Sequence, residues 1–162
     1  MKTPSNLQLT ALACLSRSPE ERKTQYELMI EINQVAELVD TPYSPGTIYP
    51  SLKTLSKGKM ININQEGCLI ENLGYQLLEN TLLTQPLPAS LIGNLHRLLL
   101  ANILPDKAIK AAVVKRVDIE LIKFNHNHGK EEQLSSANPL LPVSARQHIV
   151  TCLRRIAVDI VA

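Results

Sequence analysis

Aromatic residues are scarce in this sequence. It contains no tryptophan, one phenylalanine and four tyrosines among its 162 residues. A large ligand pocket lined with aromatic rings is therefore difficult to build. Because Phe124 is the one phenylalanine, a flat aromatic drug is a poor candidate for an effector. Leucine and isoleucine dominate a hydrophobic fraction of 44%, which is enough to fill the core of a domain.

Cysteine and histidine are too few and too scattered to predict a disulfide framework or a metal site. The odd number of cysteines is typical of reduced thiols in a cytosolic protein; they are Cys14, Cys68 and Cys152. His126 and His128 have no third ligand nearby in sequence, which favours an exposed loop over a metal pair. His148 and Cys152 lie one helical turn apart, where packing of the thiol is favoured over zinc binding. Cys68 is the one candidate for an exposed redox-sensing thiol. We predict no metal and no cofactor.

Long apolar runs are absent as well. The first ten residues, MKTPSNLQLT, do not resemble a signal peptide, and no stretch approaches the ~20 apolar residues of a membrane helix. The sequence contains no nucleophile–base arrangement, no phosphate-binding glycine loop and no paired-carboxylate motif. We therefore expect a cytoplasmic protein that is not an enzyme and has no membrane partner.

The N-terminal stretch predicts two helices. Leu7–Ser16 is a compact apolar segment, and the charged residues after it form a connector that contains Pro19. Thr24 and Glu27 have the spacing of a capping box, which begins a second helix that runs to about Val39. We expect this second helix to bury Tyr26, Met29, Ile30 and Val35 or positions near them.

The segment from Tyr43 to Lys59, YSPGTIYPSLKTLSKGK, predicts a third, amphipathic helix. Ser44 is a good N-cap, Pro45 suits the first helical position, and Pro50 predicts a local bend. The apolar face consists of Ile48, Leu52 and Leu55. The opposite face is polar and cationic without an acid, and consists of Thr47, Tyr49, Ser51, Lys53 and Thr54, followed by Lys57 and Lys59. Such a face suits a polyanion, although the net charge of +2 is weak support and an ordinary solvated helix has the same pattern.

A hairpin is predicted directly after this helix. Residues 60–64, MININ, alternate between apolar and polar, residues 65–67 form a turn, and residues 68–71 return as a second strand. Asn72 is a candidate cap for a helix from Leu73 to about Leu83. Three helices, a hairpin and a helix are the order of a winged helix-turn-helix domain, whose third helix enters the DNA major groove. We place this domain at residues 1–83.

The remaining residues, 84–162, predict a helical dimerisation segment, so the expected fold class is mainly α with a small β-hairpin. A helix is expected at residues 90–104, and Asp106 is expected to cap a longer helix that runs to about Asn125. Residues 126–142 are polar and predict a loop, after which Ser144 caps the last helix. The apolar positions of that last helix repeat as in a coiled coil. The predicted dimer interface consists of Ile109, Val113, Val117, Leu121, Ile149, Leu153, Ile156 and Ile160.

Two motifs resemble those of the PadR family of bacterial transcription regulators. YELMIEI at residues 26–32 is similar to the family's second-helix motif, and SPGTIYPSLKTL at residues 44–55 is similar to its recognition-helix motif. The resemblance covers about residues 7–83, and the C-terminal part is similar only in being helical. It implies a homodimer that binds double-stranded DNA at an inverted-repeat operator, more often as a repressor than as an activator.

The resemblance also implies that the polar face of the third helix contacts DNA. Lys53, Lys57 and Lys59 are candidates to neutralise phosphates. Tyr49 either contacts DNA or packs under the wing. No arginine lies on this helix, so the common bidentate contact with guanine is not available there. The candidate DNA-binding residues are Arg22, Lys23, Thr24, Gln25, Tyr43, Ser44, Thr47, Tyr49, Ser51, Lys53, Thr54, Lys57 and Lys59.

The predicted wing departs from the family pattern. Its tip, residues 64–67, is short and carries Glu66, whereas family wings usually carry several basic residues. Binding is therefore expected mainly from the third helix and from residues 22–25. Two alternatives stay open. One is a winged-helix adaptor that binds proteins and has lost DNA binding, and the other is a sensor with a small-molecule or protein effector at the dimer interface.

Overall fold

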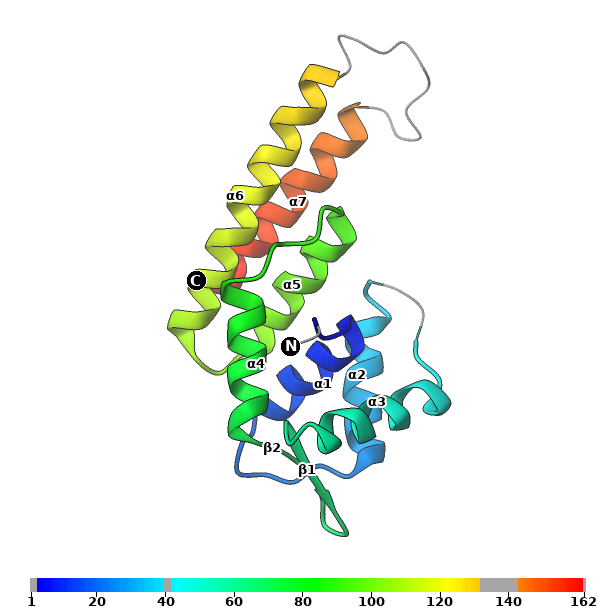
Figure 1. Cartoon of the computed structure of the whole chain (residues 1–162). Helices are drawn as coiled ribbons and strands as arrows, with labels where there is room; N and C mark the ends of the chain where they lie inside the picture. Colours follow the sequence, from blue (N-terminus) through cyan, green and yellow to red (C-terminus); the bar gives the residue numbers. More distant parts are fainter. Residues whose placement is uncertain (1–2, 40–41, 132–142, 162) are drawn as a thin grey trace.

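The computed structural model describes residues 3–39, 42–131 and 143–161, and for residues 124–131 and 143–146 it describes the backbone alone. Within these residues the chain is mainly helical, with seven helices and a two-stranded antiparallel sheet. The elements are α1 (Asn6–Ser16), α2 (Gln25–Ala36), α3 (Pro45–Lys57), β1 (Ile61–Asn64), β2 (Gly67–Ile70), α4 (Asn72–Leu83), α5 (Leu91–Ile103), α6 (Lys107–Glu131) and α7 (Val143–Val161). Figure 1 shows α1–α3 and the hairpin at one end, with α6 and α7 rising as an antiparallel pair at the other. The order of elements is compatible with a winged helix.

Side-chain caps begin two of the helices as predicted. At α2, the Thr24 hydroxyl accepts from the Glu27 N–H at 3.1 Å, and the Glu27 carboxylate accepts from the Thr24 N–H at 2.8 Å. At α6, the Asp106 carboxylate accepts from the N–H groups of Ala108 and Ile109. These bonds satisfy backbone donors that have no partner within a helix, which confirms both predicted caps.

The core is built around α1. All residues from Leu9 to Ser16 are buried, because α2, α3, α4, α5 and β2 pack around this helix. From α2, Leu28 and Ile32 point into the core and are fully buried. The predicted buried face of α2 is therefore wrong at two positions: Tyr26 is 63% exposed, and Ile30 is exposed as well. The side that faces α1 belongs to Leu28 and Ile32, which have the same four-residue spacing.

The hairpin is fastened to the connector that precedes α2. β1 and β2 pair with Asn64 opposite Gly67. The N–H and the carbonyl of Lys23 pair with the backbone of Cys68 at 3.0 and 2.7 Å, so the connector lies along β2 as a short third edge. Gly67 has a φ of 130°, and a Cβ there would collide with the Lys23 carbonyl. The strands differ by one residue from the predicted bounds, and Glu71 rather than Asn72 holds the N-cap position of α4.

The C-terminal helices continue the same core. α5 packs on α1, α6 packs on α4 and α5, and α7 packs on α5 and α6. A hydrogen bond of 2.9 Å joins Thr10 Oγ1 of α1 to His96 Nε2 of α5. Arg116 of α6 donates to the carbonyls of Leu82 and Gln85 at the end of α4. The predicted boundary at residues 83 and 84 thus lies between two helices, but one core extends across it.

Much of the predicted dimer interface lies inside the chain. Fully or largely buried are Val113, Val117, Leu121 and Leu153; half-buried are Ile109 and Ile160; exposed are Ile149 and Ile156. The buried side chains pack in the layer that α5, α6 and α7 form together. A second copy of the chain cannot contact them unless these helices separate, so a dimer needs other residues.

α6 is longer than predicted. It continues to Glu131, so residues 126–131 are helical, although the sequence predicts a loop from residue 126. α7 packs along α6 and supports it, and an ion pair of 2.6 Å joins Arg154 Nε to Asp118 Oδ1. The rest of that predicted loop, residues 132–142, lies outside the described residues, as do the side chains of His126, His128 and Ser144. No helix in the described part of the chain is long and apolar enough to cross a membrane.

Candidate nucleic-acid interface

α3 is fixed by its apolar face and by the segment that leads into it. Ile48, Leu52 and Leu55 are buried, as predicted. Ahead of the helix, Asn33 of α2 binds the backbone of Tyr43. Its Nδ2 donates to the Tyr43 carbonyl at 3.1 Å, and its Oδ1 accepts from the Tyr43 N–H at 2.8 Å. Because one side chain of α2 holds both polar groups of that residue, α2 sets the direction in which the chain enters α3.

Hydroxyl groups of α3 are partly used within the helix. The helix continues through Pro50, and the Thr54 hydroxyl donates to the Pro50 carbonyl at 2.9 Å. Ser44 holds the predicted N-cap position, but its hydroxyl lies 3.1 Å from the Thr47 hydroxyl and does not cap the backbone. Each hydroxyl keeps a lone pair for a further hydrogen bond.

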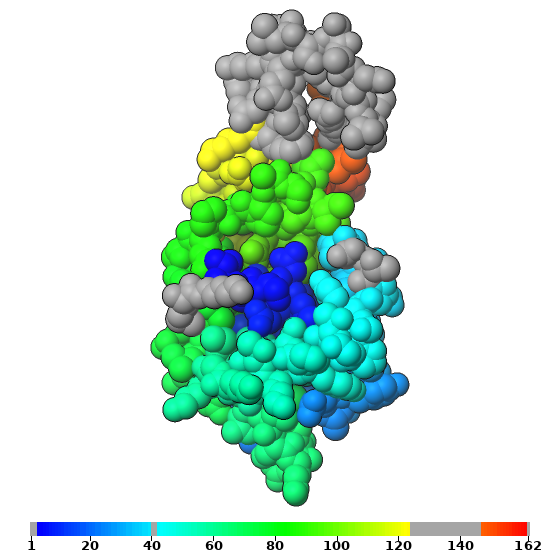
Figure 2. Space-filling view, turned by 45° about the vertical axis from the view of Figure 1, so that its right-hand side comes forward, coloured from blue at the N-terminus to red at the C-terminus, as the bar shows by residue number. Residues whose placement is uncertain are grey.

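The solvent face of α3 carries the predicted polar set. Tyr49 is 38% exposed, so its ring is open to solvent. Exposed beside it are Thr47, Lys53, Thr54 and Lys57, and Ser51 is half-buried. Figure 2 shows α3 as a cyan-to-green band across the molecule, above the protruding hairpin. Within the described residues Lys53, Lys57 and Lys59 form no ion pair, so this edge of the protein presents three free cations.

The start of α2 offers less positive charge than predicted. The Lys23 ammonium lies 2.6 Å from both Glu31 carboxylate oxygens and donates to the Cys14 carbonyl at 3.1 Å, and its side chain is only 12% exposed. Moving it to a phosphate would leave the partly buried Glu31 carboxylate unpaired, which argues against the predicted DNA contact. Thr24 and Gln25 are both exposed, but the Thr24 hydroxyl already bonds to Glu27 in the capping box.

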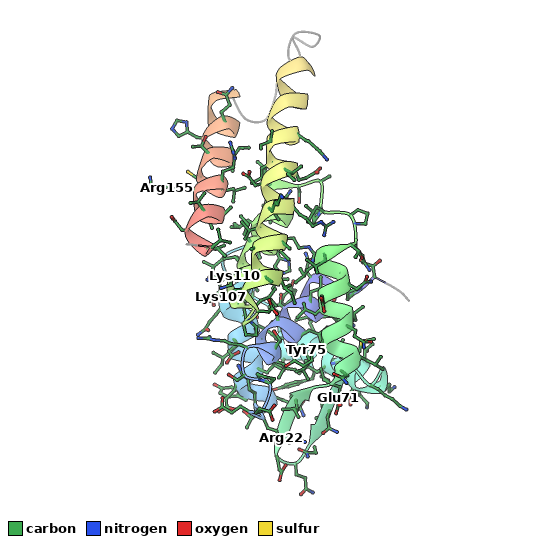
Figure 3. All side chains as sticks on the ribbon, turned by 90° about the vertical axis from the view of Figure 1, so that its left-hand side faces the viewer. Arg22, Glu71, Tyr75, Lys107, Lys110 and Arg155 are labelled. Atoms are coloured by element: carbon green, nitrogen blue, oxygen red, sulfur yellow. The ribbon has the colours of Figure 1, made fainter. Side chains whose placement is uncertain are left out.

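Arg22 is bound to the β1–β2 hairpin. Figure 3 shows it beside the hairpin, where its Nε lies 3.3 Å from Glu66 Oε2. Its Nη1 donates to Asn62 Oδ1 at 3.1 Å and to the Gly67 carbonyl at 3.4 Å. The tip itself is ordered by Asn64, whose Oδ1 accepts from the N–H groups of Glu66 and Gly67. The acid at the tip therefore compensates the charge of the arginine next to it.

The cysteines differ from two predictions. Cys68 is fully buried, and burial raises the pKa of its thiol; burial likewise raises the pKa of Cys14 to about 12. A thiol that stays protonated is a poor nucleophile, so the prediction of an exposed redox thiol at Cys68 is wrong. Cys152 is exposed, although packing was expected. Among the residues whose side chains are described, no three His, Cys, Asp or Glu lie close enough to hold a metal ion.

Two residues that shape this interface escape prediction from the sequence. Asn33 has only a weak local signal, because an asparagine in the middle of a helix is merely less common than an alanine or leucine. Glu31 is eight residues from Lys23 and on the far side of a helix start, so no helical spacing links the pair. Both contacts depend on how the connector and the turn fold back onto α2.

Neither a protein family model nor a curated protein matches this chain. Function is therefore inferred from the geometry of α3, the β1–β2 hairpin and an exposed apolar surface on α6 and α7, to which Ile122 and Val158 belong.

Proposed function

We propose that the protein is a sequence-specific DNA-binding transcription regulator of the winged-helix type, similar to PadR regulators. It acts as a homodimer and represses transcription. One observation carries the proposal. α3 buries all its large aliphatic side chains and turns an acid-free face with free lysines to solvent. A DNA major groove admits one α-helix, and its phosphates attract such a face.

The lysines and the uncharged groups of α3 have different roles in this proposal. Lys53, Lys57 and Lys59 neutralise phosphates and supply most of the affinity, which carries no sequence information. Thr47, Tyr49 and Ser51 are the groups on the same helix that can hydrogen-bond to base edges. Specificity therefore depends on hydroxyl groups rather than on arginine forks.

The dimer uses the exposed apolar surface of α6 and α7. A groove of about 450 Å³ lies between these helices, and its lining includes Val114, Val158 and Val161. Val158 is 64% exposed, and Ile122 on α6 is exposed as well. An apolar surface of this kind on a projecting pair of helices is typical of an interface. A second copy that covers it gives the two recognition helices that an inverted repeat requires.

The test is salt-dependent binding to the DNA upstream of the protein's own gene. Lys53→Ala and Lys57→Ala should each weaken binding and reduce the slope of log affinity against log salt by about 0.9, the value for one phosphate contact. Lys107→Ala is the matched control, because it removes an exposed lysine from α6. Tyr49→Ala should weaken binding to the preferred sequence more than to other sequences. If the α3 variants bind as the control does, α3 is not the recognition helix.

A second candidate is a winged-helix adaptor that binds another protein and no DNA. Its support is that Arg22 and Lys23 are held in ion pairs and that the wing tip is acidic. A gel shift with mixed genomic fragments separates the two functions. A shifted band at low salt supports the regulator, and its absence supports the adaptor.

A further inference from the structure

The connector before α2 places an arginine against the hairpin, and the charge of this arginine is compensated by an acid at the hairpin tip. In a winged helix the hairpin lies over the DNA backbone or the minor groove, next to the recognition helix. Arg22 is the one cation that contacts the hairpin through its side chain in the described part of the chain. Its partner Glu66 lies at the tip, where the side chain is 75% exposed. The residue nearest to a DNA phosphate would thus be an acid.

The arrangement around this pair is rigid. Arg22 precedes Lys23, whose backbone pairs with Cys68 of β2, so the arginine cannot move away from the hairpin with its backbone. Its Nη1 is further held by Asn62 of β1, and its side chain is only 27% exposed. Glu66 is presented by the ordered turn of Asn64. Both partners of the ion pair are therefore positioned by backbone structure and not by chance contact of two long side chains.

We propose that Glu66 restrains DNA binding by cancelling the charge of Arg22. This inference rests on the proposed DNA-binding function. Phosphate contacts add affinity for every sequence alike, whereas contacts to base edges distinguish one site from another. By keeping Arg22 paired, Glu66 lowers the affinity for every DNA sequence alike, so stable binding depends on the contacts that α3 makes with base edges.

Glu66→Gln removes the charge and retains the length and hydrogen-bonding capacity of the side chain. Because Glu66 is exposed, the variant is expected to fold as the wild type does, which circular dichroism verifies. Its matched control is Glu71→Gln, which removes an exposed acid from the other end of β2 where no hydrogen bond to its side chain caps the helix. The position of Glu71 is labelled with that of Arg22 in Figure 3.

The assay is fluorescence anisotropy with a short labelled duplex of mixed sequence, so that no operator needs to be known. Glu66→Gln should bind it at least about threefold more tightly than the wild type at about 50 mM salt. Arg22 then adds one phosphate contact, so the advantage should fall about 3.5-fold between about 50 and about 200 mM salt. Glu71→Gln should show a smaller gain.

Arg22→Ala identifies the group that is released. In the Glu66→Gln background it should abolish most of the gain. In the wild type it leaves the exposed, solvated Glu66 charge uncompensated and should weaken binding by less than it does in that background. The inference is overturned if Glu66→Gln binds no more tightly than Glu71→Gln, or if Arg22→Ala weakens both backgrounds equally. In either case Lys57→Ala can still weaken binding, which would leave the proposed function in place. Absence of binding by the wild type and all variants at low salt would overturn both.

Discussion

Lowering the pH from about 7 to about 5 is expected to destabilise the protein through a single buried imidazole. His96 is 3% exposed, and burial, assisted by the neighbouring charge of Arg97, lowers its pKa from the ordinary 6.5 to about 4. The Thr10 hydroxyl donates to the Asn6 carbonyl, so its contact with His96 Nε2 requires that the ring donates there. In the neutral ring Nδ1 is then unprotonated, and it is buried without a described hydrogen-bond partner. A proton on Nδ1 would be both charged and unsatisfied.

The sign and size of the effect follow from the two pKa values. The unfolded chain takes up the proton near pH 6.5 and the folded chain only near pH 4, so the stabilisation is complete above the first value and is lost as the pH falls. The free energy of unfolding should drop by about 2 kcal/mol at pH 5 and about 3 kcal/mol at pH 4. Glu27 has a lowered pKa because the backbone and side chain of Thr24 donate to it, and its contribution is lost only below about pH 4.5. Among the described groups whose pKa is shifted, only His96 therefore changes the stability between about pH 5 and 7.

Urea denaturation followed by circular dichroism measures this loss. His96→Leu should remove most of the difference between the two pH values, whatever its effect at pH 7. Thr10→Val is the control, because it removes the hydrogen bond, at a cost of about 1 kcal/mol at either pH, and leaves the imidazole buried. It should retain the pH dependence. If the wild type loses no more stability between the two pH values than His96→Leu does, the imidazole is not buried between α1 and α5. That result would contradict the packing of α5 on α1.

Two further predictions concern packing. Gly74→Ala should lower the free energy of unfolding by about 2 kcal/mol or more in the same urea assay. The added Cβ would collide with the Met60 carbonyl and push α4 away from the hairpin. An unchanged denaturation midpoint would contradict that contact. Val117→Glu should destabilise the chain itself by several kcal/mol, because Val117 is fully buried. Val158→Glu should leave the chain folded, as judged by circular dichroism, and should dissociate the proposed dimer in sedimentation experiments, because Val158 is exposed on the chain by itself. A Val158→Glu protein that stays dimeric would place the interface elsewhere.

Prediction from the sequence succeeds where neighbours in the chain decide the structure. The capping box at Thr24 and the carboxylate cap at Asp106 consist of residues two or three positions apart, so the sequence contains all the partners. The apolar face of α3 is equally local: Ile48, Leu52 and Leu55 are the only large aliphatic residues of that helix, and burial has no alternative. The exposed lysines follow from the same pattern.

Prediction fails where two local patterns are equally good or where the partner is distant. On α2, Tyr26 and Ile30 have the same spacing as Leu28 and Ile32, and only the position of α1 decides which pair is buried. The apolar stripe around Val117 predicts packing but does not distinguish a helix of the same chain from a second copy. In the structure α5 and α7 cover it. Lys23 is a plausible phosphate contact until the fold brings Glu31 to within 2.6 Å.

Because one core extends from α1 through α5 to α6, the position of α3 relative to the α6–α7 pair is fixed. α3 packs on α1, α6 and α7 pack on α5, and α1 is joined to α5 by packing and by the Thr10–His96 hydrogen bond. In the proposed dimer through α6 and α7, the fold would set the separation of the two α3 helices. A change of one base pair between the half-sites of the proposed operator would turn one half-site by about a tenth of a helical turn, which two helices at a fixed separation could not follow.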